Sequence, residues 1–115
     1  MSDFTVAFHV DKIDGSLAVA LNNAINYAKG IPGQDYHMVL VVNSAAVKEL
    51  VAEKALVLET LPLALEFGLE VRACRNALLA TGTAPEQLFA GCQVVPAGIV
   101  ELVRLQKQGY AYIKP

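Results

Sequence analysis

The chain has 115 residues, of which 55% are hydrophobic and 17% charged, with a mean hydropathy of +0.44 and a formal net charge of −2. This length predicts one domain over residues 1–115, and the apolar composition excludes a disordered chain. The 9 basic and 11 acidic residues are scattered singly, so they form no polybasic surface for nucleic acid. The apolar excess predicts that another subunit covers part of the surface, and we expect a homo-oligomer.

Residues 1–10 lack the basic segment of a secretory signal. The longest strongly apolar run, residues 38–42, is far shorter than the ~20 residues that cross a bilayer. We therefore expect a soluble, cytoplasmic protein without membrane contact. Cys74 and Cys92 could in principle pair, but one disulfide in a cytosolic domain of this size would be unusual, so both are expected to be free thiols.

Strands and helices alternate along the chain. Short, continuous apolar runs are typical of strands buried on both sides, and five are expected, at residues 4–10, 37–42, 69–73, 93–95 and 110–113. Apolar residues at helical spacing, with capping residues and glycines, predict helices at residues 14–30, after Ser44, from Thr60 to Gly68, at 76–81 and at 97–108. Residues 53–59 favour neither structure. This alternation predicts an α/β fold with a parallel sheet covered by helices on both faces.

The ends and faces of these helices can also be predicted. Asp14 is expected to cap the first helix, and Ser44 the second. The Thr83-x-x-Glu86 spacing is that of a capping box. The last helix is expected to turn one side inward, formed by Ile99, Leu102, Val103 and Gln106.

Ligands of open parallel sheets bind beyond the carboxyl ends of the strands, which directs attention to Cys74. Cys74 lies where the third strand ends and a helix begins, between Arg72 and Arg75. A helix N-terminus and nearby guanidinium groups both favour a reactive thiolate. The alternative is a small cysteine that only packs in the core.

The other candidate residues carry weaker signals. His9 can act as a proton shuttle or ligand at the sheet edge, or it can be a hydrogen-bonded core histidine. His37 begins the second strand and is expected at the surface of the opposite edge, while Cys92 is expected to pack without reacting. His9, Cys74, Cys92 and Asp11 have metal-binding side chains but lack ligand spacing, and no glycine-rich phosphate loop is present, so we predict neither metal nor cofactor.

Three segments and the opening strand carry a family resemblance. The stretches LEVRACRNAL (69–78), VVPAGI (94–99) and LQKQGYAYIKP (105–115), with FHVD (8–11), resemble the DsrE/DsrF-like sulfur-relay family, whose fold is YchN-like. The resemblance spans nearly the whole chain. It implies a three-layer α/β/α sandwich with a mainly parallel five-stranded sheet, and assembly as a trimer or hexamer.

The resemblance also implies a chemistry. Some members carry a persulfide on a cysteine after the third strand and pass it to a partner thiol, and Cys74 matches that position. Arg75, which stands where a glycine is usual, and the amides of the helix start would stabilise the anion, with Asn76 as a hydrogen-bond donor. Possible partners are sulfur donor and acceptor proteins.

Three hypotheses follow. The first is a cytosolic sulfur-relay-like protein that uses Cys74. The second is a non-catalytic oligomeric module that binds a small ligand or metal in a pocket at the strand ends, lined by His9, Asn43, Cys74 and Asn76. The third is a structural subunit whose apolar face completes a larger complex. A persulfide on Cys74 would favour the first, ligand-dependent stabilisation that survives Cys74→Ala the second, and a fixed co-purifying partner the third.

Overall fold

The computed structural model describes residues 3–115. Its strands are β1 (Phe4–Val10), β2 (Tyr36–Val42), β3 (Glu70–Cys74), β4 (Gln93–Val95) and β5 (Ala111–Ile113). The α-helices are α1 (Ser16–Gly30), α2 (Ala52–Ala55), α3 (Thr60–Glu66), α4 (Arg75–Thr81) and α5 (Gly98–Lys107). Two 3₁₀ helices, η1 (Ser44–Leu50) and η2 (Pro85–Gln87), complete the chain.

The five strands form one sheet in the order β4-β3-β2-β1-β5, and every neighbouring pair is parallel. The register pairs Val10 with Val42 and Cys74 with Val95, so the carboxyl ends of four strands meet at one edge. The predicted fold class, an α/β/α sandwich with a five-stranded parallel sheet, is confirmed.

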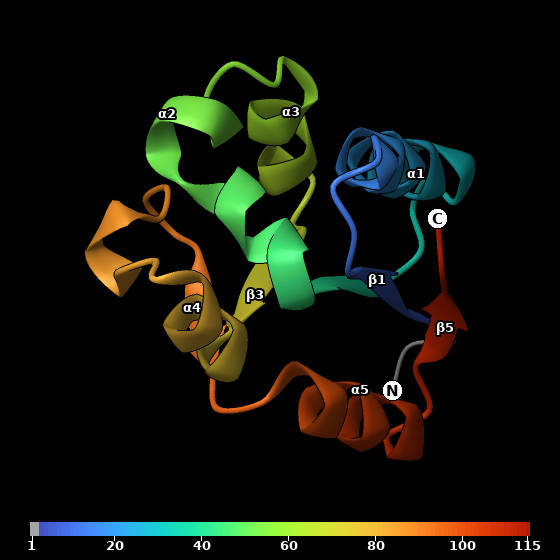
Figure 1. Ribbon diagram of the computed structural model, residues 1–115. Helices are drawn as coiled ribbons and strands as arrows, with labels where there is room; N and C mark the ends of the chain where they lie inside the picture. The colour runs from blue at the N-terminus through green and yellow to red at the C-terminus, as the bar shows by residue number, and fades with distance from the viewer. Residues whose placement is uncertain (1–2) are drawn as a thin grey trace.

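The two faces of the sheet are covered unequally (Figure 1). Helices α1, α3, α4 and the 3₁₀ helix η1 pack on one face, where the larger core contains Phe8, Leu40 and Val71. Helix α5 lies on the opposite face, over a small cluster in which Leu102 and Leu105 meet Val39 and Val41. Burial of these aliphatic side chains supplies the main stabilising term of the fold.

Helix α5 does not bury the face that its apolar pattern predicts. Its sheet-facing side consists of Gly98, Glu101, Leu102 and Leu105, whereas Ile99 and Val103 are exposed. The reason is electrostatic: Arg72 of β3 projects toward α5, and Glu101 accepts a hydrogen bond from its guanidinium at 2.6 Å. A charge buried at this depth requires a partner, so the helix turns an acidic side chain inward.

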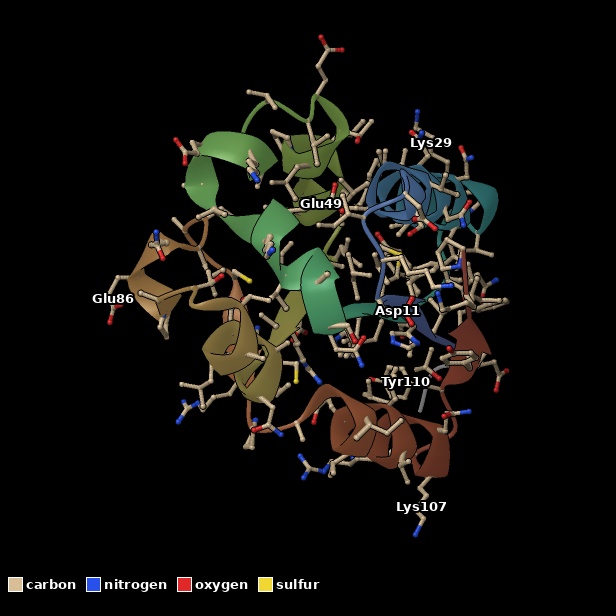
Figure 2. All side chains as sticks on the ribbon, in the orientation of Figure 1. Asp11, Lys29, Glu49, Glu86, Lys107 and Tyr110 are labelled. Carbon is tan, nitrogen blue, oxygen red and sulfur yellow. The ribbon has the colours of Figure 1, made fainter. Side chains whose placement is uncertain are left out.

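A second polar cluster occupies the amino edge of the same face. His37 contacts both the Tyr110 hydroxyl and the Glu70 carboxylate, and Arg72 donates to Glu70 at 2.8 Å. Figure 2 shows Tyr110 between α5 and the sheet. His37 is therefore half-buried in a network, rather than a simple surface residue.

Several predicted helix ends are close to the observed ones, but none of the three predicted caps is formed as expected. Gly15 is the N-cap of α1, but Asp14 still accepts hydrogen bonds from the Ser16 amide and hydroxyl. Ser44 does not cap a helix; it is the first residue of η1. Thr83 forms no capping box with Glu86; instead the Gln87 side chain accepts from the Ala84 amide at 2.7 Å.

Within residues 3–115, no helix combines the length and apolar character needed to span a membrane.

Candidate functional site

Cys74 occupies the junction between β3 and α4 at the carboxyl edge of the sheet. It is the last residue of β3 and the N-cap of α4, with extended backbone angles. Only 6% of its surface is exposed, and its thiol is free. The backbone amides at a helix start carry a partial positive charge, and Cys74 lies directly before those of α4.

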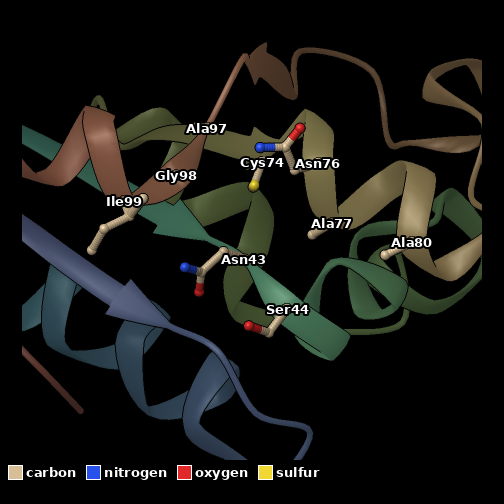
Figure 3. A pocket seen from close by; sticks show the side chains of 9 residues that line it. All are labelled: Asn43, Ser44, Cys74, Asn76, Ala77, Ala80, Ala97, Gly98 and Ile99. Carbon is tan, nitrogen blue, oxygen red and sulfur yellow. The ribbon is translucent and has the colours of Figure 1, made fainter.

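The Cys74 sulfur faces a pocket with a volume of about 340 Å³ (Figure 3). The polar side chains that line it are those of Asn43, Ser44, Cys74 and Asn76. Apolar groups of α4 and α5, among them Ala77, Ala80 and Ile99, form the rest of the wall. No acidic or basic side chain belongs to this lining, so the polar groups that face a ligand are neutral amides, a hydroxyl and the thiol.

The first turn of α5 approaches the pocket because Gly98 has no side chain. A Cβ built on Gly98 would lie 3.1 Å from the Cβ of Asn43, 3.3 Å from that of Cys74 and 3.4 Å from a Val41 methyl. The N-cap of α5, Ala97, supplies no side-chain cap to the helix. The amides of this turn are therefore left for a group in the pocket, and they favour a negative one.

The loop after β2 contributes two pocket residues in an unusual backbone conformation. Ser44 has φ 53, and among residues 3–115 it is the one residue other than glycine with a positive φ. Such conformations cost free energy and concentrate at functional sites. The backbone N–H of Asn43 donates to the Val10 carbonyl at 3.1 Å, which anchors this loop to β1.

His9 does not line the pocket but contacts Asn43, which does. It lies near the end of β1, is 9% exposed, and contacts Asn43 through Nε2 and Tyr112 through Nδ1. Sequence reasoning identified His9 and Asn43 but missed Tyr112. The sequence near Tyr112 does not indicate this contact. The tyrosine reaches His9 only because β5 pairs with β1, which sets Tyr112 opposite Ala7.

The two arginines near Cys74 have different surroundings. The Arg72 guanidinium donates hydrogen bonds to Glu70, Glu101 and Gln93, so it is engaged with these residues rather than with the Cys74 thiol. Burial alone would lower the pKa of Arg72, but the carboxylates of Glu70 and Glu101 outweigh it and raise the pKa above its ordinary value. Arg75 is exposed on α4 and is not part of the pocket lining, whereas Asn76 is.

Cys92 is remote from the site. Cys74 pairs with Val95 in the β3–β4 register, so Cys92 lies three residues away, roughly 10 Å along the strand. This separation is too long for a disulfide, whose Cα atoms lie within about 7 Å. Burial raises the pKa of the Cys92 thiol to about 12, which keeps it protonated at neutral pH.

The described residues contain no group of three or more His, Cys, Asp or Glu side chains that could hold a metal ion. Asp11, one of the four candidates by residue type, is instead paired with Lys114 at 2.8 Å. The Lys114 hydrogen bond and charge lower the pKa of this carboxyl below its usual value, although partial burial opposes them.

These features define an α/β protein with an all-parallel sheet and a cysteine pocket at its carboxyl edge. The model of the DsrE/DsrF-like family matches residues 4–115, so the chain belongs to this family. No curated protein matches it.

Three solved structures are similar to the chain. A protein of unknown function from Methanobacterium thermoautotrophicum, MTH1491, is 28% identical with a TM-score of 0.87, over 97% of this chain and 99% of that one. The ychN protein from E. coli is 16% identical, with a TM-score of 0.74 over 97% and 99% of the two chains. BT1422 from Bacteroides thetaiotaomicron, also of unknown function, is 18% identical, with a TM-score of 0.68 over 95% and 94%. The latter two show the YchN-like fold alone.

Proposed function

We propose that this protein is a sulfur carrier that holds a sulfane sulfur on Cys74 and passes it to a partner thiol. The observation that carries this proposal is the position of the Cys74 thiol, free and buried at the start of α4, facing a pocket beside the first turn of α5. Membership of the DsrE/DsrF-like family supports the same chemistry.

Both transfer steps are thiolate exchanges without net oxidation. The Cys74 thiolate attacks the outer sulfur of a donor persulfide; the donor S–S bond breaks, the donor thiolate leaves, and Cys74 carries the S–SH group. An acceptor thiolate then attacks that outer sulfur and releases the Cys74 thiolate. The pocket is larger than one sulfur atom needs, so the attacking thiol can enter, while the burial of Cys74 limits loss of sulfur to water.

The residues around Cys74 have supporting roles in this proposal. Asn43 and Asn76 contribute amide donors to the pocket, and His9 holds Asn43 in place. Arg75, exposed beside the pocket, attracts anionic sulfur species at longer range. The donor and acceptor are proteins or small thiols of the cytoplasm, where free thiols persist.

The carrier is further proposed to be a homo-oligomer, a trimer or hexamer. Helix α5 exposes three apolar side chains on its outer side, with Ile99, Val100 and Val103 at 64%, 54% and 46% exposure. Ile99 also lines the pocket, so a neighbouring copy on this surface would reach the pocket mouth. Exposed apolar side chains grouped on one helix are typical of a subunit contact.

The decisive experiment is sulfur transfer followed by intact mass. The wild-type protein, incubated with polysulfide or a cysteine desulfurase and cysteine, is expected to gain one sulfur atom that dithiothreitol removes. Cys74→Ser abolishes the gain, whereas Cys92→Ser, the matched control, retains it because the Cys92 thiol stays protonated. Absence of the gain in wild type, or its persistence in Cys74→Ser, would rule the carrier function out.

A second candidate is a small-ligand module, which the volume of about 340 Å³ favours, because ligand pockets begin near 300 Å³. In that case the cysteine is part of the wall. A ligand of this kind would raise the melting temperature of Cys74→Ala as much as that of wild type. If the protein is instead a sulfur carrier, Cys74→Ala should no longer respond to the sulfur compounds that modify wild type.

A further inference from the structure

His9 joins three separate elements at the carboxyl edge. Its Nδ1 lies 2.7 Å from the Tyr112 hydroxyl of β5, and its Nε2 lies 2.9 Å from Oδ1 of Asn43, in the loop after β2. The His9 and Tyr112 rings also contact each other, with centroids 5.8 Å apart. The imidazole therefore has a partner at each nitrogen and a fixed orientation.

The two contacts determine the tautomer of the neutral ring. An amide oxygen can only accept, so Nε2 must carry the proton that it donates to Asn43. Nδ1 is then left with its lone pair and accepts the hydrogen of the Tyr112 hydroxyl. A neutral imidazole of the opposite tautomer would have an Nε2 lone pair, and Asn43 would have to turn its amide nitrogen toward it.

The orientation of Asn43 matters because its side chain lines the pocket. With Oδ1 held by His9, the amide nitrogen is the end of the side chain left for a group in the pocket. Figure 3 shows Asn43 and Cys74 in the same pocket wall, with the Asn43 oxygen turned toward β1. The pocket therefore presents N–H donors, together with the first turn of α5, and no acidic side chain.

We propose that Tyr112 and His9 are positioning residues that hold the Asn43 amide with its N–H groups toward the pocket, and that this orientation selects negatively charged sulfur groups. In the carrier, the selected group is the outer sulfur of the Cys74 persulfide or an incoming thiolate. The identity of that occupant rests on the proposed function; the orientation of Asn43 and its preference for anions do not.

The test compares two alkylating reagents at Cys74, in a Cys92→Ser background and at one fixed pH. Iodoacetate is anionic and iodoacetamide neutral, so the ratio of their rates reports the preference for an anion, while the ionisation of the thiol cancels. Tyr112→Phe keeps the ring and removes the hydroxyl. Both tautomers then become accessible to His9, so Asn43 is correctly turned in only about half of the molecules, and we expect the iodoacetate-to-iodoacetamide ratio to fall roughly twofold.

Two further variants make the result specific. Asn43→Ala removes the amide without adding a charge, so the ratio falls whatever the tautomer, and adding Tyr112→Phe to it changes nothing more. Tyr110→Phe is the matched control, because Tyr110 contacts His37 at the opposite edge of the sheet. Its ratio stays at the wild-type value. A general loosening of the fold would raise both rates and leave the ratio unchanged.

Nitrogen NMR of labelled protein reads the tautomer directly. Wild type is expected to show a proton on Nε2 of His9, and Tyr112→Phe a mixture. An unchanged reagent ratio in Tyr112→Phe, an equal fall in Tyr110→Phe, or an Nδ1 proton in wild type would each overturn the proposal. If the ratio responds while Cys74 acquires no sulfur, the positioning role stands and the carrier function fails.

Discussion

Gly98 of α5 packs directly against Cys74 of β3: a Cβ on Gly98 would lie 3.3 Å from the Cβ of Cys74. This close approach brings the first turn of a helix to the candidate nucleophile. Gly98 is therefore required for its small size, since its backbone does not have a positive φ.

The first prediction concerns Gly98→Ala. The added methyl group must displace Asn43, Cys74 or α5, so we expect a destabilisation of about 1–3 kcal/mol and slower alkylation of Cys74. Denaturant unfolding and intact mass measure the two effects. Gly30→Ala is the control, because Gly30 ends α1 with no atom within 4 Å of a built Cβ. Equal effects of the two substitutions would contradict the packing argument.

The second prediction concerns acid stability. Burial alone would raise the pKa of Glu70, but hydrogen bonds from His37, Arg72 and Gln93 outweigh it and lower the pKa to about 2. A lowered carboxyl pKa stabilises the fold above the unfolded-state value near 4.5, and this contribution is lost as the pH falls toward 2. Wild type should therefore lose roughly 1 kcal/mol more than Glu70→Gln between pH 5 and 2, after allowance for solvent screening.

Chemical denaturation at several pH values tests this difference. Glu86→Gln, at an exposed position on the far side of α4 in Figure 2, is the control and should follow the wild-type pH profile. A Glu70→Gln profile as steep as that of wild type would show that other groups cause the acid sensitivity.

The third prediction concerns Glu49 in η1. Its Oε1 atom is buried and has no hydrogen-bond partner among the described residues. Burial, and secondarily the charge of Asp14, raises the pKa of this carboxyl. A raised carboxyl pKa means that stability falls as the pH rises past the unfolded-state value near 4.5.

Glu49→Gln removes that charge and should stabilise the protein at pH 7 by roughly 0.5–1 kcal/mol, with no gain at pH 3. Thermal unfolding at the two pH values measures the effect. Figure 2 places Glu49 beside α1, whereas Glu66 at the end of α3 is exposed, and Glu66→Gln should change stability little at either pH. A loss of stability in Glu49→Gln at pH 7 would disprove the explanation.

The fourth prediction concerns the outer surface of α5. A charge at Val103 would be buried without a partner in the proposed oligomer, so Val103→Glu should raise its dissociation constant by roughly tenfold or more. Light scattering over a concentration series measures the assembly. Val57→Glu is the control, because Val57 is 74% exposed between α2 and α3, on the other side of the sheet. A wild-type protein that stays monomeric throughout would remove the basis of this prediction.

The sequence by itself determined the strands, the α/β class and the candidate cysteine. Apolar runs such as residues 37–42 predict buried parallel strands because both faces of the sheet are covered, and β2 (Tyr36–Val42) agrees within one residue. Cys74 could be selected because the strand-to-helix junction is visible in the local pattern. These features depend on neighbours in the sequence.

Other features depend on residues that are distant in the sequence, and only the tertiary structure decided them. Which side of α5 faces inward depends on Arg72, 29 residues before Glu101, because the half-buried guanidinium takes Glu101 as its partner although the apolar pattern favours another side. The role of Tyr112 depends on β5 pairing with β1, which places its hydroxyl on His9 across 103 residues. The spacing of apolar residues in the sequence indicates which residues are buried. Which group a buried polar side chain contacts is determined by the order of the strands in the sheet.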